Sequence, residues 1–150
     1  MRESGVALVA SFGISDGLDV LDLGCGDGST AVPEARLGAN VLGVDIASNL
    51  VAAGNARAQS LGLTNCRFQE GDASDLSELD DGSFDLVVSI FGAMSAPRPF
   101  DVAKEAVRVT RPGGRIVMGN WPPNDPTLVA QILRISSSYS PPLRKGSSAR

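Results

Sequence analysis

A glycine-rich turn that follows an apolar run constrains this chain more than any other feature. Residues 20–30 have the sequence VLDLGCGDGST, and a helix-compatible segment follows over residues 30–37. Gly24 and Gly26 can adopt backbone angles closed to other residues, so the chain can reverse sharply there. Without a Cβ, a ligand can lie directly against the backbone, and the free N–H groups of the following helix point at the same spot. The stretch therefore predicts the strand–turn–helix unit that opens a nucleotide-binding α/β domain.

The spacing of these glycines bears on which ligand the turn accepts. A dinucleotide-binding turn has the pattern G-x-G-x-x-G, which here would place its third glycine at position 29. That position is Ser29 and the third glycine is Gly28, while Asp22 precedes Gly24 by two residues. An acid at a strand end repels a pyrophosphate but suits a ligand that carries an ammonium group. The alternative interpretation is a turn that only connects a strand to a helix.

Apolar segments alternate with turn-forming residues along the rest of the chain. Apolar runs bounded by glycine, proline or acidic residues are typical of strands, and apolar residues at i, i+3 and i+4 are typical of helices. The expected strands span residues 19–23, 40–44, 65–69, 84–91 and 115–119, the last after a tight turn at 111–114. The expected helices span residues 3–13, 29–37, 48–61, 100–109 and 128–138, with a loop at 92–99.

This alternation predicts an α/β fold with a doubly wound, Rossmann-like sheet of five mainly parallel strands and helices on both faces. Residues 1–140 are long enough for one domain with a single core, and residues 141–150 are expected to form a disordered tail. On the third expected helix, the apolar face is predicted to consist of Leu50, Gly54, Ala58 and Leu61.

Four polar side chains stand at or just past the ends of consecutive expected strands. They are Asp22, Asp45, Asp72 and Ser89. Ligands of such sheets bind at the carboxyl ends of the strands, where the strand order reverses. The coincidence of four polar residues at these ends predicts one ligand site more firmly than the glycines alone.

The composition argues against several classes of function. The net charge of −4 and the scattered basic residues disfavour a nucleic-acid partner. The chain has no histidine, which is the usual base for a serine or cysteine nucleophile. Without histidine a zinc site would need carboxylate ligands, and no spacing of acidic residues suggests one. The two cysteines, Cys25 and Cys66, indicate free thiols in a reducing compartment, so we expect a cytoplasmic protein. No run is long and apolar enough to span a bilayer, and residues 1–3 begin no signal pattern.

Several stretches taken together resemble the class I S-adenosylmethionine-dependent methyltransferases. They are VLDLGCGDG, LGVDIA, EGDA, FDLVVSIFG and RPGGRIVM, in this order between residues 19 and 121. The first is close to that family's first motif. Each is weakly to moderately specific alone, whereas the ordered set at these intervals is a strong signal. The resemblance implies S-adenosylmethionine as the cofactor and in-line methyl transfer to a small-molecule acceptor, in which the protein mainly orients and desolvates the reactants.

The resemblance also implies roles for the residues at the strand ends. The carboxylate of Asp45 can accept two hydroxyl hydrogen bonds, so it is the candidate for the ribose, and Ile46 is the candidate to cover one adenine face. Asp72 matches the acid that meets the exocyclic amine of the adenine, and the backbone N–H of Ala73 matches the donor to a ring nitrogen. The implied cofactor-binding residues are Asp22, Gly24, Cys25, Gly26, Gly28, Asp45, Ile46, Asp72, Ala73 and Ser89.

Two of these residues are candidates for the amino-acid end of the cofactor. Asp22 would hold its ammonium group, directly or through a water, and Ser89 would offer its carbonyl to the same amine. Structural alternatives stand beside these roles. Asp22 would cap the amides of the turn, Asp45 would be a helix N-terminal acid, Ile46 would be plain core, and Asp72 would be an exposed turn acid.

Phe91, Met94 and Trp121 are the candidates on the side from which a methyl acceptor approaches. An aromatic face near a sulfonium is attractive through a cation–π contact. The alternative for Phe91 and Trp121 is anchoring of the core or of a loop. No residue stands out as a general base, so the sequence assigns no catalytic residue.

The sheet of this family normally closes with an antiparallel hairpin after the last helix, and nothing after Ser140 can supply it. We therefore expect an uncovered edge at the fifth strand, which favours self-association, with a homodimer as one outcome. Two other functions stay open. A non-catalytic remnant that keeps the cofactor pocket is favoured by the missing hairpin, and a nicotinamide-dependent oxidoreductase is disfavoured by Ser29 and Asp22.

Overall fold

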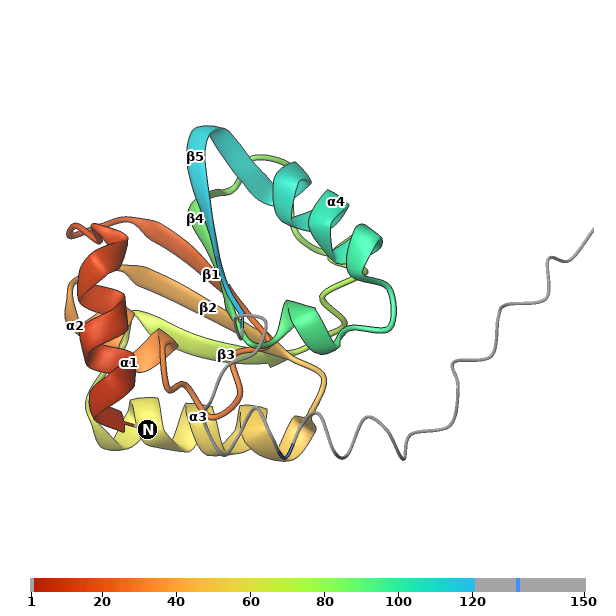
Figure 1. Cartoon of the computed structure of the whole chain (residues 1–150). Coiled ribbons are helices and arrows are strands. Elements are labelled where there is room, and N and C mark those ends of the chain that lie inside the picture. Colours follow the sequence, from red (N-terminus) through yellow and green to blue (C-terminus); the bar gives the residue numbers. More distant parts are fainter. Residues whose placement is uncertain (1, 121–131, 133–150) are drawn as a thin grey trace, which may run out of the picture. The chain divides into compact units, whose positions relative to one another are not determined.

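Five parallel strands form one sheet in the computed structural model, which describes residues 2–120 and 132 (Figure 1). The order across the sheet is β3-β2-β1-β4-β5, and every neighbouring pair is parallel. The expectation of a parallel, Rossmann-like sheet is therefore confirmed. The strands are β1 Asp19–Leu23, β2 Asn40–Asp45, β3 Cys66–Glu70, β4 Phe84–Ile90 and β5 Thr110–Gly119.

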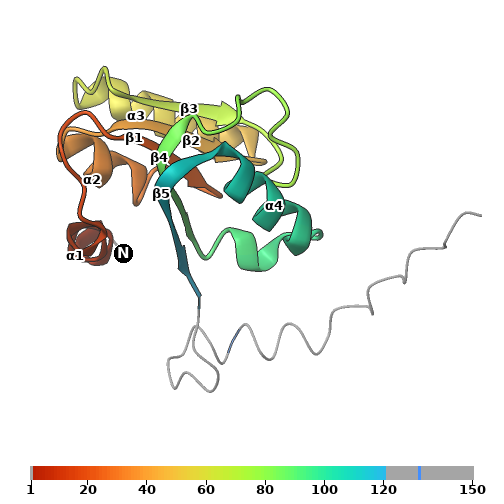
Figure 2. The ribbon, with the colours of Figure 1, turned by 90° about the horizontal axis from the view of Figure 1, so that it is seen from above.

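Helices cover both faces of this sheet, as the view from above in Figure 2 also shows. One face carries α1, α2 and α3, and the opposite face carries α4. This is the doubly wound arrangement that alternating strands and helices predict. The helices are α1 Arg2–Val9, α2 Ala31–Arg36, α3 Ser48–Ser60 and α4 Pro99–Val109, with the short 3-10 helices η1 Ala10–Phe12 and η2 Ala93–Ser95.

Successive residues of the central strands supply two separate hydrophobic cores. Val20 and Leu86 belong to the core beneath α1, α2 and α3, whereas Leu21 and Val87 belong to the core beneath α4. All four are fully buried, because neighbouring side chains of a strand point to opposite faces and both faces are covered. Burial on both faces is the physical reason for the nearly continuous apolar runs in the sequence.

The strand order reverses at β1, which places the functional edge of the sheet. The chain runs outward from β1 to β2 and β3 and then returns to add β4 and β5 on the other side of β1. The segments that leave the carboxyl ends of β1 and β4 therefore diverge to opposite sides. Such a reversal opens a crevice in which ligands of α/β sheets bind.

The apolar face of α3 differs from the expectation. Leu50 and Leu61 are exposed by more than a third, whereas Val51, Gly54 and Ala58 are buried. A Cβ on Gly54 would lie 2.8 Å from the ring of Phe68, so this helix approaches the sheet along its smallest residues. Leu50 and Leu61 point to the outer sides of α3, so the prediction was right for Gly54 and Ala58 and wrong for the two leucines.

The start of β5 is also different from the expected turn. Thr110 already pairs with Phe84, and the next pair joins Arg115 to Leu86, so residues 111–114 form an irregularity within the strand. The guanidinium of Arg111 lies 2.8 Å from Asp19 and 2.7 Å from Asp85. These ion pairs fasten the irregular segment to the amino ends of β1 and β4. Helix α2 is likewise shorter than expected, because the glycine turn extends to residue 30.

Some expectations fall on parts of the chain outside the described residues. Trp121 and the tail at 141–150 lie there, and of the expected helix at 128–138 only residue 132 is described. The division into a domain at 1–140 and a tail therefore stays a prediction. Among the strands that the structure describes, β5 is an edge strand, with Ile116 and Met118 exposed. No helix within the described part of the chain is long and apolar enough to cross a membrane.

Candidate functional site

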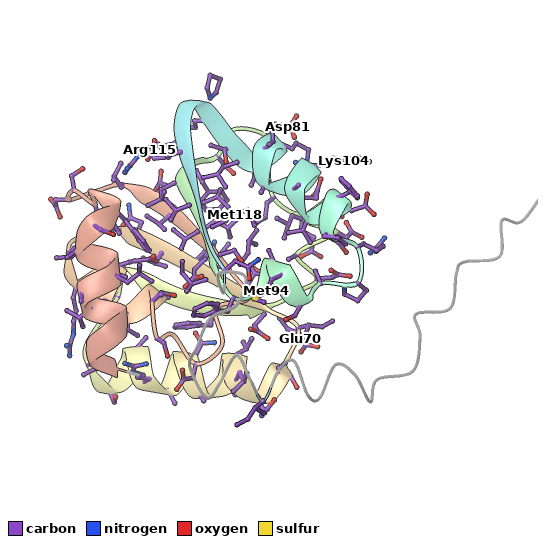
Figure 3. The ribbon with its side chains drawn as sticks, in the orientation of Figure 1. Glu70, Asp81, Met94, Lys104, Arg115 and Met118 are labelled. Atoms are coloured by element: carbon purple, nitrogen blue, oxygen red, sulfur yellow. The ribbon has the colours of Figure 1, made fainter. Side chains whose placement is uncertain are left out.

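A cleft of about 260 Å³ lies at the carboxyl ends of the strands, between the segments that follow β1, β2, β3 and β4. Figure 3, in which Glu70 and Met94 are labelled, shows the side chains at this end of the sheet. The structure brings six of the predicted site residues together in its wall. They are Gly24, Asp45, Ile46, Asp72, Ala73 and Phe91.

Close backbone approach forms the floor of this cleft. Gly24 has a φ of +70°, and a Cβ on it would lie 2.6 Å from the Cα of Gly92, beyond the end of β4. No side chain fits between two segments at that separation. Gly26 has a φ of +56°, yet a Cβ on it would meet nothing within 4 Å. Gly24 is thus required by packing against β4, whereas Gly26 leaves open space beside its backbone, as a ligand cradle requires.

The remaining predicted residues of the turn face the protein interior. A Cβ on Gly28 would lie 2.6 Å from the Phe68 ring, so this glycine makes room for an aromatic side chain. The Cys25 side chain is buried against Gly43, and burial strongly raises the pKa of its thiol. Burial likewise raises the pKa of Cys66 to about 11. Both thiols are therefore protonated and inaccessible at neutral pH.

Two backbone amides hold the carboxylate of Asp45. Its Oδ2 accepts a hydrogen bond from the Gly26 N–H at 2.8 Å, and its Oδ1 accepts one from the Ala47 N–H at 2.9 Å. The side chain that ends β2 is therefore fixed against the glycine turn that follows β1. Each oxygen keeps a further lone pair, so the carboxylate can accept two more hydrogen bonds from a ligand.

The side chain of Ile46 is 74% exposed beside Asp45, and it lines the cleft. The alternative that Ile46 is plain core is therefore wrong. A large apolar side chain in the wall of a cleft offers a flat contact to an apolar or aromatic part of a ligand.

Asp72 stands on the opposite rim and is held by its own loop. Its Oδ1 accepts hydrogen bonds from the Ser74 N–H at 2.8 Å and from the Ser74 hydroxyl at 2.6 Å. Its Oδ2 lies 3.3 Å from Nη2 of Arg98. Hydrogen bonds from Ser74, with a smaller contribution from Arg98, lower the pKa of Asp72, so its carboxylate is ionised at neutral pH. Ala73 follows it in the cleft wall.

Asp22 is 1% exposed and does not line the cleft. Its carboxylate accepts hydrogen bonds from the Thr30 hydroxyl and from the Ala31 N–H, at the beginning of α2. Burial raises the pKa of Asp22 to about 6, although both hydrogen bonds oppose this shift. These contacts match the capping alternative, and a role toward the ammonium group of a ligand stays a prediction.

A second buried acid, Glu34, lies on α2 and is fully buried. Neither of its carboxylate oxygens has a hydrogen-bond partner among the described residues. Burial, reinforced by the charge of Asp22, raises the pKa of Glu34 to about 9. Its side chain is therefore a neutral acid at pH 7. No local pattern predicts this burial, because it depends on how α2 packs against the sheet.

Ser89 links the two sides of the strand-order reversal. Its hydroxyl donates to the Leu23 carbonyl at 2.8 Å and accepts from the Ala93 N–H at 2.9 Å. The buried side chain therefore ties β4 to the end of β1 and to η2. Neither of these contacts tests the predicted role of the Ser89 carbonyl toward a ligand amine.

Two of the acceptor-side candidates lie next to the cleft. Phe91 is 41% exposed, lines the cleft and has a φ of +64°, which is strained for an aromatic residue. Met94 on η2 is 43% exposed (Figure 3). Both carry accessible apolar surface, so Phe91 is not a buried core residue, while the alternative that it anchors a loop stays open.

Sequence reasoning missed half of the cleft wall. Gly92 had a detectable signal, because it directly follows the expected strand at 84–91 as Gly24 directly follows β1, and the two glycines meet in the structure. The loop that follows β4 had no such signal. The missed residues are Val44, Gly71, Gly92, Ser95, Ala96 and Pro97.

A second hollow, of about 320 Å³, lies at the amino ends of the strands near Asp19, Asn40 and Asn65. It contains no part of the glycine turn, and ligands of parallel sheets bind at the opposite edge, so we assign the functional site to the cleft. No group of three or more His, Cys, Asp or Glu residues that could hold a metal ion occurs among the described residues.

A Rossmann-like sheet with a cleft at its strand-order reversal is the architecture of the doubly wound α/β domains. Residues 21–118 match the family model of the methyltransferase domain. The chain therefore belongs to this family, and its resemblance to S-adenosylmethionine-dependent methyltransferases is confirmed.

The known proteins that this chain is similar to include a methyltransferase. The chain is 42% identical over 121 residues to the uncharacterized protein Rv1405c of Mycobacterium tuberculosis, which covers 81% of this chain and 43% of that protein. It is 39% identical over 124 residues to the arsenite methyltransferase of Aquipseudomonas alcaligenes, which covers 77% of this chain and 36% of that protein. The crystal structure of the YcgJ protein of Bacillus subtilis aligns with a TM-score of 0.77 and 27% identity, over 89% of this chain and 58% of that one. The chain spans less than half the length of the two curated relatives.

Proposed function

We propose that this chain binds S-adenosylmethionine in the cleft and transfers its methyl group to a small-molecule acceptor. One observation carries the proposal. The Asp45 carboxylate at the end of β2 is fixed by the Gly26 N–H of the glycine turn, and it keeps a free acceptor position on each oxygen. A rigid pair of acceptors beside an open glycine backbone suits the ribose diol of such a cofactor.

The residues around the cleft fit the parts of this cofactor. The open space beside Gly26 would take its amino-acid end against the backbone. The exposed side chain of Ile46 would cover one face of the adenine. On the far rim, Asp72 would accept from the exocyclic amine, and the Ala73 N–H would donate to a ring nitrogen. Asp22, buried beneath the turn, would act on the ammonium group through its charge or through a water.

When bound, S-adenosylmethionine supplies an electrophilic methyl group on a cationic sulfur. The work left to the protein is orientation and exclusion of water, which require a fixed cleft more than a proton-transfer residue. Phe91 would present an aromatic face to the sulfonium, where a cation–π contact is attractive. Met94 would add apolar surface on the side from which the acceptor approaches. We assign no general base.

The two cysteines bear on the class of acceptor. The similarity to an arsenite methyltransferase raises the question of a metalloid acceptor, for which thiolates are the natural soft ligands. Cys25 and Cys66 are both buried, and both thiols have raised pKa values. This favours an organic small molecule over a metalloid held by the cysteines of this chain.

Isothermal titration with S-adenosylhomocysteine tests the cofactor site. We expect the wild-type chain to bind, and Asp45→Ala to weaken binding by about 1–3 kcal/mol, which is the loss typical of hydrogen bonds to a charged group. Asp80→Ala, which removes an exposed acid outside the cleft, is the matched control and should leave the affinity unchanged. A folded wild-type chain that does not bind S-adenosylhomocysteine would overturn the proposal.

Transfer assays separate the proposed function from its rivals. Methylation of any member of a small-molecule panel supports the enzyme, whereas tight cofactor binding without transfer supports a non-catalytic remnant. Binding of a reduced nicotinamide nucleotide in place of S-adenosylhomocysteine would support an oxidoreductase. Family membership and the serine at position 29 favour methyl transfer over this last option.

A further inference from the structure

Arg98 joins the two segments that form opposite sides of the cleft. It immediately precedes α4, and its backbone is not helical, with a φ of −125° and a ψ of 69°. Its Nη2 lies 3.3 Å from Asp72 Oδ2 and donates to the Ser74 hydroxyl oxygen at 2.7 Å. One cation therefore connects the segment after β3 to the segment after β4.

The contacts of Arg98 contribute little to the stability of the fold. Its side chain is 57% exposed and that of Asp72 is 48% exposed. Ion pairs at such exposure have small or unmeasurable effects on stability, because water screens the charges. A second ion pair of Arg98, to Asp101, is longer at 3.9 Å, and the Asp101 side chain is 40% exposed. We therefore expect Arg98 to affect the geometry of the cleft more than the stability of the fold.

The hydrogen bonds of the Asp72 carboxylate divide unequally between its two oxygens. Oδ1 accepts from both the N–H and the hydroxyl of Ser74. Among the described residues, Oδ2 accepts one hydrogen bond, from Arg98 at 3.3 Å, and so keeps acceptor capacity for a ligand. Ser74 donates to Asp72 and accepts from Arg98, which closes a triangle of three side chains. This triangle fixes the rotation of the carboxylate and hence the direction of Oδ2.

We propose that Arg98 is a positioning residue that gives the site its selectivity for a purine base with a 6-amino group. The inference rests on the proposed function, because it takes the adenine of S-adenosylmethionine to lie at Asp72 and Ala73. A fixed carboxylate oxygen attracts an amino group and repels the carbonyl oxygen of hypoxanthine at the same position. A carboxylate that rotates freely discriminates less, because it can turn away from the carbonyl oxygen.

The ratio of two dissociation constants measures this selectivity. S-adenosylhomocysteine and S-inosylhomocysteine differ at the 6-position of the purine and in the proton that N1 of hypoxanthine carries, and both can be titrated calorimetrically into the full chain. We expect wild type to favour S-adenosylhomocysteine by about 10- to 100-fold, as for a hydrogen bond to a charged acceptor. In Arg98→Ala the ratio should fall by at least about threefold, mainly through weaker binding of S-adenosylhomocysteine, while any preference that the Ala73 N–H adds at N1 stays unchanged.

Three further variants sharpen the test. Arg98→Lys keeps the charge but not the fork of donors, and its ratio should lie between those of wild type and Arg98→Ala. Asp72→Asn can donate to a carbonyl oxygen and should remove or invert the preference. Lys104→Ala removes a 79% exposed cation on α4 and should leave the ratio at the wild-type value. Circular dichroism confirms that each variant is folded.

The outcomes separate this inference from the proposed function. A wild-type ratio that Arg98→Ala leaves unchanged, including equal weakening of both ligands, would show that Arg98 is only a surface ion pair. Equal binding of both ligands by wild type would also overturn the inference while the cofactor site stands. A wild-type chain that binds neither ligand would overturn the proposed function and the inference with it.

Discussion

Replacing Glu34 should change how the stability of this protein depends on pH. Its carboxyl group is fully buried, and neither oxygen has a partner among the described residues. Burial, with a smaller contribution from the charge of Asp22, raises the pKa of Glu34 from an ordinary 4.5 to about 9. The folded state therefore binds the proton of Glu34 more tightly than the unfolded state does.

The sign and size of the effect follow from this difference. Below pH 4.5 the group is protonated in both states and does not affect the pH dependence. As the pH rises, the unfolded chain ionises first, so folding loses about 1.4 kcal/mol per pH unit until the folded pKa is reached. At pH 7 the accumulated loss is about 3 kcal/mol, a large part of the stability of a typical domain.

Glu34→Gln removes the titration while it keeps the shape of the side chain. We expect the free energy of unfolding of wild type to fall steeply between pH 5 and pH 8, relative to that of Glu34→Gln. Glu34→Leu should also remove the unpartnered polar atoms and be more stable than wild type by about 3 kcal/mol at pH 7. The chain has no histidine, and Asp22, whose pKa burial raises to about 6, titrates in this window in wild type and in Glu34→Gln alike, so the difference between the two curves reports Glu34.

Urea denaturation followed by circular dichroism, repeated at half-unit steps of pH, measures these differences. Glu78→Gln, at an exposed acid on a loop, is the control and should give a curve parallel to that of wild type. Parallel curves for wild type and Glu34→Gln would contradict this prediction, because they would mean that the Glu34 carboxyl group reaches water or a donor in the folded protein.

Two further predictions concern packing and the loop before β4. Gly24→Ala should destabilise the fold by about 2–4 kcal/mol, because backbone strain adds to the clash against Gly92. Gly62→Ala, at a similar φ but in open space, should lose only about 1–2 kcal/mol of stability. Equal losses of the two variants in urea denaturation would contradict the close approach of Gly24 to Gly92. Arg108→Met should lower stability by about 2 kcal/mol and speed amide hydrogen exchange over residues 76–81, because Arg108 donates to the Leu76 and Leu79 carbonyls at 2.8 Å. Unchanged exchange in that segment would contradict this role.

Much of the fold could be predicted from local patterns. The run from Val20 to Gly28, and the later alternation of apolar and turn-forming segments, indicated a parallel α/β sheet and the edge that carries the site. Asp45, Ile46 and Asp72 could be placed in the cleft because each lies at or just past the carboxyl end of a strand. The predictions for the buried face of α3 and for the start of β5 were wrong in part. Both features depend on the neighbouring elements that pack against the helix or pair with the strand, and not on the spacing of apolar residues within the element itself.

The parallel α/β architecture and the residues at the carboxyl ends of the strands follow from local patterns in the chain, since a residue that follows a strand must lie at that strand's end. Which segments meet at this edge depends on the packing of the whole domain. The contact of Gly24 with Gly92, the ion pair of Asp72 with Arg98 and the burial of Glu34 all depend on the order of the strands or on helix packing. Local sequence patterns reflect the period of one element, whereas these contacts join residues far apart in the chain, whose proximity only the assembled sheet creates.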